Sequence, residues 1–166
     1  MKTIRIIMIS CALVLATAAR AQQRNYTLRA TVGTGTAFDV PSTTPVLTQL
    51  IAAKQLSKRW TLGMGTGLSV YEKALIPLFV HASYQIARWG DVSLIGEANM
   101  GGTILHSGSY VAPAVGIRYR RYYLSVGYEN QSFKRIKQFE TPHFISSYRE
   151  ELSHHNATLR FGIYLK

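Results

Sequence analysis

The sequence predicts an all-β fold, namely an eight-stranded antiparallel up-and-down transmembrane β-barrel. Apolar residues alternate with small or polar residues along most of the chain, which is typical of strands with two unlike faces. No stretch combines a sustained 3.6-residue period with helix caps. The polar faces consist mainly of small residues and carry few charges, so they suit a crowded barrel interior better than a surface in water.

The first 21 residues are predicted to be a cleaved signal peptide. Two basic residues precede an apolar run over residues 6–16, and residues 19–21 read Ala-Arg-Ala, an A-x-A cleavage pattern. The apolar run is shorter than the roughly 20 residues that a spanning helix needs, which makes an N-terminal membrane anchor the weaker alternative. The mature chain, residues 22–166, is expected to form one domain. It lacks cysteine because Cys11 lies in the signal, so its stability must come from its own core, from oligomerisation or from a bilayer.

The alternation gives eight candidate strands, with turn residues between them at the spacing of a barrel or sandwich. They cover residues 26–38, 46–56, 60–71, 75–86, 92–103, 110–119, 122–133 and 156–166. Lengths near ten residues fit a tilted membrane strand. The turns at residues 57–59, 88–91 and 120–121 are short and basic. The long connection at residues 134–155 belongs to the opposite end, and we expect it to be an exposed loop that is mobile toward its middle.

The third strand, within RWTLGMGTGLSVY, shows the two faces most clearly. One face carries the small residues Thr61, Gly63, Gly65, Gly67 and Ser69, and the other the mostly large apolar residues Trp60, Leu62, Met64, Thr66, Leu68 and Val70. A soluble secreted barrel would need a charged outer surface, but here the charges lie mostly in turns and loops. We therefore expect the apolar face to contact lipid, including Leu62, Leu94, Val126 and Leu159. The small face would then make space inside the barrel for larger residues of other strands.

Aromatic residues gather near both ends of the predicted strands. Those near the short turns are Tyr26, Trp60, Tyr84, Trp89, Tyr119, Tyr122 and Tyr164, and those toward the other ends are Phe38, Tyr71, Tyr110 and Phe133. Two aromatic girdles around an apolar band are typical of membrane barrels. The alternative is that tyrosine is simply common in strands.

Five charged residues are predicted by their parity to point into the barrel: Arg29, Glu97, Arg118, Glu129 and Arg160. Unpaired charges in so enclosed a space would be costly, so we expect them to pair and to plug the lumen. If the final hairpin places Gly127 opposite Gly162, the same register places Glu129 opposite Arg160. Arg29 on the closing strand would be a possible third member. The alternative is that these charges only contact water in the lumen.

The mature chain resembles small bacterial outer-membrane barrels of the OmpA/OmpX-like type. The resemblance rests on the signal peptide, the short basic turns and the final strand NATLRFGIYLK, which is similar to a C-terminal barrel-insertion signal but ends on Lys166 instead of an aromatic residue. It implies that residues 22–166 form an outer-membrane β-barrel domain of a Gram-negative bacterium. Both termini and the short turns would lie in the periplasm, and the long loops outside the cell. Outer-membrane lipid and the barrel-assembly machinery are the implied partners.

The many basic residues suggest two kinds of binding partner. The formal net charge of +11 raises the possibility of nucleic-acid binding, but Lys58, Arg59, Arg88, Arg120 and Arg121 lie in separate turns with no nucleic-acid-binding motif around them, so we expect none. Basic residues of the longer loops could contact lipopolysaccharide phosphates, and they are Lys73, Lys134, Arg135, Lys137 and Arg149. A solvated loop is the simpler interpretation for each of them.

His81 and Ser83 are the only weak candidates for catalysis. They share one face of the fourth predicted strand, a spacing that resembles the outer-membrane lipid A deacylases, which are also eight-stranded barrels. Tyr84 and Gln85 replace the Asn-Ala that follows Ser in that family, no matching Glu is evident, and the pair is expected to face the lumen. We expect no cofactor and no metal, since the histidines and glutamates of the long connection show no fixed ligand spacing; they are His143, Glu150, Glu151, His154 and His155.

The sequence therefore predicts a structural or surface-interaction barrel with a side-chain-filled lumen, acting through extracellular loops whose ligand is unknown. A lipid A-modifying enzyme on the same barrel and a soluble secreted ligand-binding barrel are the alternatives.

Overall fold

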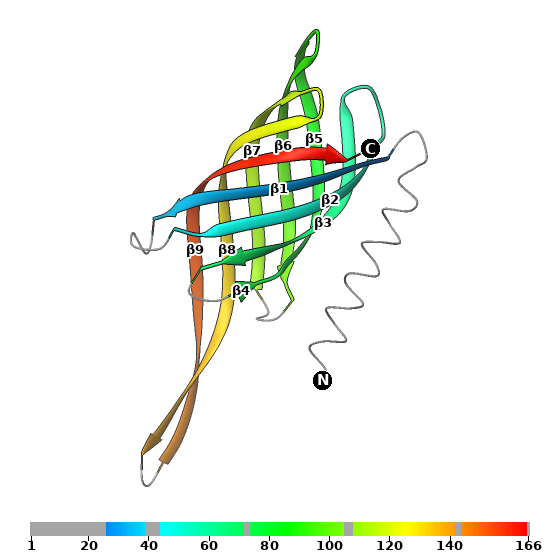
Figure 1. Cartoon of the computed structure of the whole chain (residues 1–166). Helices are drawn as coiled ribbons and strands as arrows, with labels where there is room; N and C mark the ends of the chain where they lie inside the picture. Colours follow the sequence, from blue (N-terminus) through cyan, green and yellow to red (C-terminus); the bar gives the residue numbers. More distant parts are fainter. Residues whose placement is uncertain (1–25, 39–43, 72–73, 105–107, 142–143, 166) are drawn as a thin grey trace.

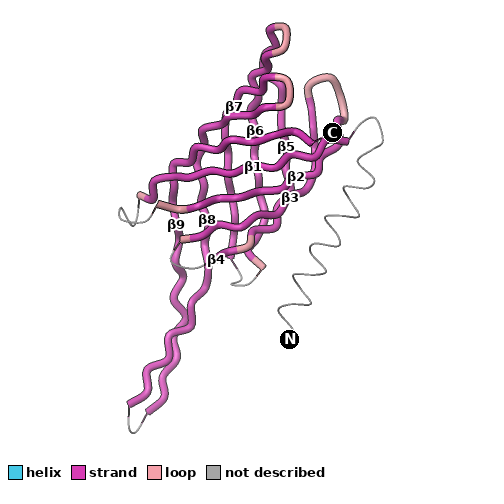
Figure 2. Tube along the Cα trace, viewed as in Figure 1, coloured by secondary structure: helices cyan, strands magenta, loops and turns pink. Residues whose placement is uncertain are grey.

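The computed structural model describes residues 26–38, 44–71, 74–104, 108–141 and 144–165, and for residues 133–152 it describes the backbone only. The predicted signal peptide lies outside these ranges. Every regular element within them is a β-strand (Figures 1 and 2). No helix long and apolar enough to cross a bilayer occurs in the described ranges.

The strands form one closed antiparallel sheet. They are β1 (Tyr26–Ala37), β2 (Val46–Gln55), β3 (Trp60–Val70), β4 (Ala74–Leu75), β5 (Pro77–Trp89), β6 (Val92–Thr103), β7 (Gly108–Tyr119), β8 (Tyr122–Thr141) and β9 (Phe144–Leu165). β1 pairs with β9 on one side and with β2 on the other, and β2 pairs with β3, so the sheet closes on itself. The two-residue β4 pairs antiparallel with the end of β3 in the same register as β5, so it continues the line of β5 and leaves eight strands around the barrel. The predicted eight-stranded antiparallel barrel is confirmed, and within the described barrel wall its closure pairs every strand on both sides.

The β8–β9 hairpin corrects the predicted long loop. The two strands stay paired from Tyr122 opposite Ile163 to Thr141 opposite Phe144, and the hairpin projects beyond the barrel at the end away from the short turns (Figure 1). The apolar residues here recur every third position, at Phe133, Ile136 and Phe139, so alternation did not mark a strand. Residues 128–141 contain neither Gly nor Pro, so none of them interrupts a strand. The backbone hydrogen bonds between β8 and β9 do not require apolar and polar side chains to alternate.

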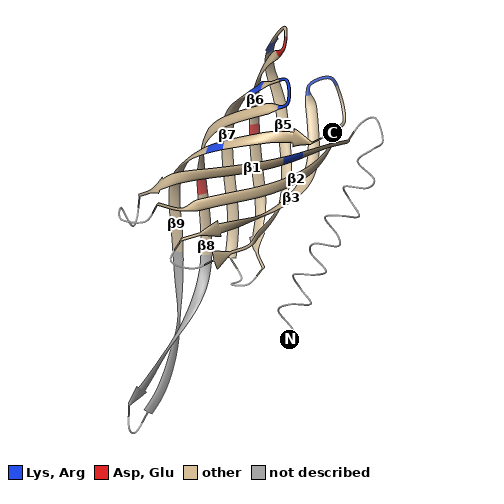
Figure 3. Ribbon diagram, in the orientation of Figure 1, with Lys and Arg blue, Asp and Glu red and all other residues tan. Residues whose placement is uncertain are grey.

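The outer face of the barrel is apolar. Leu62, Val126 and Leu159 are 45%, 60% and 49% exposed, and Leu94 is half-buried between the buried residues Ser93 and Ile95. Most Lys, Arg, Asp and Glu positions of the described residues lie at the short turns, and few lie along the strands of the wall (Figure 3). The charged residues within the strands include Arg29, Glu97, Glu129 and Arg160, and these four are buried. The predicted parity of the strands is therefore confirmed.

A β-bulge interrupts this alternation in β5. Gln85 pairs with Ile95 and the next pair is Ala87 with Leu94, so Ile86 is an extra residue without a partner in the ladder. The strand then runs to Trp89, three residues past its predicted end, and turns at Gly90, whose φ of 57° suits glycine. Because the bulge inserts one residue, Arg88 lies opposite the inward-facing Ser93, and Trp89 faces outward.

Candidate functional site: the barrel lumen and its mouth

The small residues of the inner wall make room for large side chains of neighbouring strands, as predicted. A Cβ atom on Gly65 of β3 would lie 2.6 Å from Cζ of Phe79 and 3.0 Å from Cγ1 of Ile51. On β7, a Cβ atom on Gly116 would lie 2.6 Å from the ring of Tyr123. Both glycines are required by this close approach, because a larger residue would displace the aromatic ring that fills the lumen.

Glu129 is the centre of the deeper polar layer. Its Oε2 accepts hydrogen bonds from Nη2 of Arg160 at 2.5 Å and from the hydroxyl of Tyr110 at 3.3 Å. Its Oε1 accepts from the hydroxyl of Tyr71 at 3.1 Å and from Ser69 at 3.4 Å. Glu129 and Tyr110 are completely buried, so both carboxylate oxygens obtain partners from the protein in place of water.

A second charged layer lies nearer the short turns. Nη2 of Arg29 is 2.7 Å from Oε2 of Glu97, and both side chains are almost fully buried. The guanidinium carbon lies 4.1 Å from the ring centroid of Tyr123, a cation–π contact, and Nη1 donates to the hydroxyl of Tyr164 at 3.4 Å. β1 and β6 are four strands apart around the eight-stranded barrel, so this ion pair spans the lumen from one side to the other.

Two hydrogen bonds of the deeper layer also link opposite strands. The hydroxyl of Tyr71, at the end of β3, reaches Glu129 on β8, and Nε2 of Gln49 on β2 donates to the hydroxyl of Tyr110 on β7 at 2.6 Å. Each of these pairs of strands is again four positions apart in the sheet order. Side chains therefore brace the lumen across its width at two levels.

The predicted register of the final hairpin is wrong, although the structure brings Glu129 and Arg160 together. Glu129 lies opposite Asn156, and Arg160 lies opposite Ser125. The offset from the predicted register is four residues, an even number, so both side chains still face inward, and the long arginine side chain reaches the carboxylate diagonally. Arg29 does not join this pair because it binds Glu97.

Arg118, the fifth predicted lumen charge, lies at the mouth of the barrel. Its guanidinium carbon is 5.4 Å from the ring centroid of Tyr164, and the side chain is only half-buried. It is one of the residues that line a cavity at this end.

His81 and Ser83 both face the lumen and are separated from the apolar outer surface. Nδ1 of His81 is 2.7 Å from the amide oxygen of Asn99, and the His81 ring is buried. The group that orients His81 is thus a neutral amide on the neighbouring strand, not a carboxylate. This arrangement gives no nucleophile and base pair on the outer face, where a lipid substrate would meet the protein.

The described histidines of the long hairpin lie on opposite faces of β9. His154 stacks on Tyr71 with ring centroids 4.7 Å apart, inside the barrel, whereas His155 hydrogen-bonds the hydroxyl of the outward-facing Tyr128. They cannot share one metal ion. The other members of that sequence group, His143, Glu150 and Glu151, lie outside the described side chains.

The aromatic residues near the short turns lie on the outer face with one exception. Tyr26, Trp60, Trp89, Tyr119 and Tyr122 are exposed, and Tyr84 packs against Trp60 with ring centroids 4.9 Å apart. Tyr164 is wrongly assigned to this girdle, because it has the inward parity of Arg160 and contacts Arg29.

The second predicted girdle, at the opposite end, is mostly wrong. Tyr71 and Tyr110 are buried in the lumen, where they bind Glu129. Phe38 is exposed on the outside, and the side chain of Phe133 is not described. The prediction rested on the closeness of these residues to strand ends. Closeness to an end does not determine whether a side chain points outward or into the lumen.

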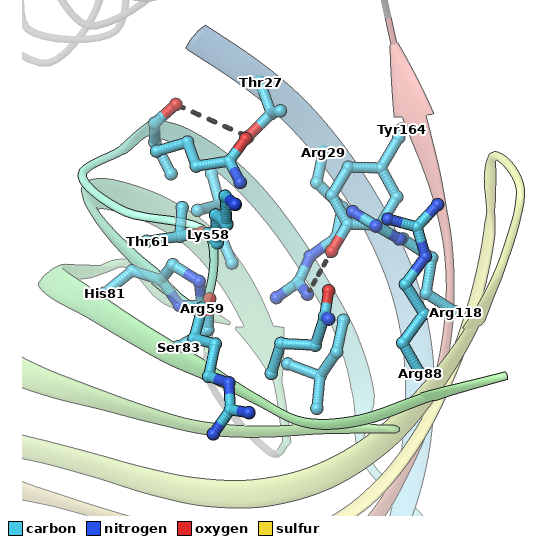
Figure 4. Close-up of a pocket in the computed structure, with 15 residues that line it drawn as sticks. Thr27, Arg29, Lys58, Arg59, Thr61, His81, Ser83, Arg88, Arg118 and Tyr164 are labelled. Atoms are coloured by element: carbon cyan, nitrogen blue, oxygen red, sulfur yellow. Dashed lines mark hydrogen bonds between the residues drawn. The ribbon is translucent and has the colours of Figure 1, made fainter. Parts of the chain in front are cut away.

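The mouth of the lumen at the short-turn end contains a cavity of about 180 Å³. Its walls come from seven strands and the β2–β3 turn, and Figure 4 shows the charged and polar side chains that converge on it. Five of the lining residues are cationic: Arg29, Lys58, Arg59, Arg88 and Arg118. The polar ones are Thr27, Gln55, Thr61, His81, Ser83, Gln85 and Tyr164. None of the described residues that line the cavity is acidic.

These features define an eight-stranded closed antiparallel barrel with an apolar outer face and a braced, charged interior. No protein-family model and no curated protein matches the chain. Among solved structures, a de novo designed transmembrane β-barrel aligns with a TM-score of 0.51 and 14% identity, covering 86% of this chain and 98% of the design. The solution NMR structure of the designed barrel TMB2.3 aligns with a TM-score of 0.50 and 15% identity, covering 87% and 98%.

A natural barrel is also similar. The crystal structure of Neisserial surface protein A aligns with a TM-score of 0.48 and 9% identity, covering 83% of this chain and 94% of that protein. At these identities the likeness is one of fold. The predicted resemblance to small eight-stranded membrane barrels is confirmed at that level.

Proposed function

We propose that the chain is an integral outer-membrane barrel that conducts no solute and serves the cell envelope structurally or through its extracellular end. The observation that carries this proposal is the distribution of apolar and charged side chains, which is the reverse of that in a soluble protein. Side chains such as Met64 and Val126 are exposed on the outer face, while Glu129 and Arg160 are buried inside. In a bilayer, lipid would cover this apolar outer face, whereas in water the same face would be exposed and would make the protein poorly soluble.

The braced lumen supports the absence of transport. Arg29 and Glu97 meet across the full width of the barrel, and the layer around Glu129 lies beyond them. A conducting path would need both layers to open, which would leave buried charges without partners. The proposed role therefore belongs to the barrel surface and to the end that carries the β8–β9 hairpin.

The two alternatives from the sequence are less well supported. A soluble ligand-binding barrel would need an outer surface rich in charge, and the outer face here is apolar. A lipid A-modifying enzyme would need its catalytic groups outside, whereas His81 and Ser83 face the lumen.

The test uses the mature chain refolded in detergent and in lipid vesicles. We expect a compact, faster-migrating form on unheated detergent gels that converts to the unfolded form on heating, and no steady ion conductance in planar bilayers. A soluble, detergent-independent monomer would refute the membrane proposal. Large steady conductance would refute the plugged lumen but not the membrane location.

A further inference from the structure

We propose that the cationic mouth of the barrel is a binding site for an oxyanion, either phosphate or carboxylate. The mouth is defined here as the cavity lined by Lys58, Arg59, Arg88 and Arg118 above the Arg29–Glu97 pair. The site exists in the folded barrel whether or not the barrel spans a membrane, so this inference does not rest on the proposed function.

The cations of the mouth lack acidic partners in the described part of the chain. Glu97 at the floor is paired with Arg29. Asp91 in the adjacent β5–β6 turn is paired with Arg120, whose Nε lies 2.9 Å from Oδ2 of the aspartate. Arg59 and Arg88 donate instead to neutral oxygens, the hydroxyl of Tyr84 and the carbonyl of Gly90. Like charges around one cavity repel, and a bound anion would relieve that repulsion.

The bulge at Ile86 brings Arg88 to this cavity. In a regular strand that continued from Ser83 and Gln85, Arg88 would have outward parity and would face the lipid side. The extra residue reverses the parity, so that Arg88 lies opposite Ser93 and lines the mouth. Bulges are frequent beside binding sites because they redirect a side chain in this way.

The remaining lining groups match the chemistry of an oxyanion. Guanidinium groups donate paired hydrogen bonds that fit phosphate and carboxylate, and the hydroxyls of Thr61, Ser83 and Tyr164 add further donors. Since Nδ1 of His81 contacts Asn99, Nε2 is the ring nitrogen that remains for the cavity that His81 lines. The charge and the donors thus favour an anion over a cation or an apolar ligand.

The size and depth of the cavity limit what can enter. Its volume of about 180 Å³ is more than ten times the roughly 10–15 Å³ of such space that one water molecule needs. A small anion fits entirely, and a larger molecule can insert only its anionic group. Arg29, Glu97 and Tyr123 close the floor, so the ligand enters and leaves on the short-turn side. The mouth is a binding site and not the entrance of a pore.

The experiment measures anion binding to the mature barrel refolded in octyl glucoside, an uncharged detergent without phosphate. Pyrophosphate and citrate are titrated calorimetrically at low salt, and phosphatidylglycerol is added to the micelles in a separate arm, with phosphatidylcholine as the neutral comparison. The test variants are Arg88→Gln and Arg118→Gln, each of which removes one cation from the mouth. The matched control is Arg121→Gln, a basic turn residue that does not line the cavity. Heat-modifiable migration confirms that every variant is folded.

We expect saturable one-site binding of pyrophosphate or citrate that weakens at least about tenfold in each test variant and changes less than about twofold in the control. Saturation only by phosphatidylglycerol, with the same dependence on Arg88 and Arg118, would also support the site and assign the ligand as a lipid headgroup. Absence of saturable binding in every arm would overturn the proposal. Equal weakening in Arg121→Gln would overturn it as well, because binding would then follow net charge and not the cavity.

Discussion

Removing the ion pair that spans the lumen should cost much more than removing an ion pair at the surface. Arg29 and Glu97 are only 3% and 1% exposed as side chains, so either one left alone would be a buried, uncompensated charge. From that burial we expect Arg29→Met or Glu97→Leu to lower the free energy of unfolding by about 3–5 kcal/mol each. The double variant removes both charges and should lose less than the sum of the single losses, by about 3 kcal/mol or more.

The barrel contains a matched control for this cycle. Arg120 and Asp91 form an ion pair of nearly the same length, 2.9 Å against 2.7 Å, but their side chains are 67% and 57% exposed. Solvent screens such a pair, so its coupling energy should be about 0–1 kcal/mol. Both cycles can be measured by urea unfolding in lipid vesicles, with the fluorescence of Trp60 and Trp89 as the probe. Additive losses for the lumen pair, within about 0.5 kcal/mol, would refute the bracing role.

Three further predictions concern the wall and the hairpin. Val126→Arg, in the middle of the apolar band, should cost about 2–4 kcal/mol on refolding into vesicles, whereas Leu94→Arg, close to the short turns, should cost about 0–1 kcal/mol; equal costs would contradict the depth assignment. Gly65→Val should destabilise the barrel by about 1–3 kcal/mol, because its side chain would collide with the Phe79 ring, and unchanged stability in urea would argue against a packed lumen. Trypsin added to intact cells should cut first within residues 134–155, since a two-stranded hairpin outside a barrel is only marginally stable; cleavage only after permeabilisation would invert the topology.

The sequence predicted the strands and their faces because both depend on local alternation. Leu62 and Gly63 are neighbours whose opposite environments follow from the period of two alone. The register between strands is a non-local property, and there the sequence was less informative. Ser125, and not Glu129, lies opposite Arg160, yet the inward direction of both charges could be predicted because an even offset preserves it.

The predictions from the sequence failed where the alternation of apolar and small residues is interrupted or where the structure does not depend on it. Nothing in the sequence around Ile86 marks the bulge, so the inward direction of Arg88 could only come from the structure. The lumen role of Tyr71 could have been predicted, since it has the parity of Ser69, but its position near a strand end suggested a girdle residue. The extended hairpin was missed because its backbone pairing does not require alternating side chains.

The contacts between opposite strands also bear on how fast the barrel comes apart. Arg29 and Glu97 are separated by 68 residues and Tyr71 and Glu129 by 58, and each pair reaches across the barrel, so we expect these contacts to form only after the sheet has curved almost to closure. Interactions that form after the folding transition state leave the folding rate nearly unchanged and slow unfolding instead. The contacts across the lumen should therefore slow the unfolding of the barrel. A closed barrel would persist for long periods, even if the balance between its folded and unfolded states were unexceptional.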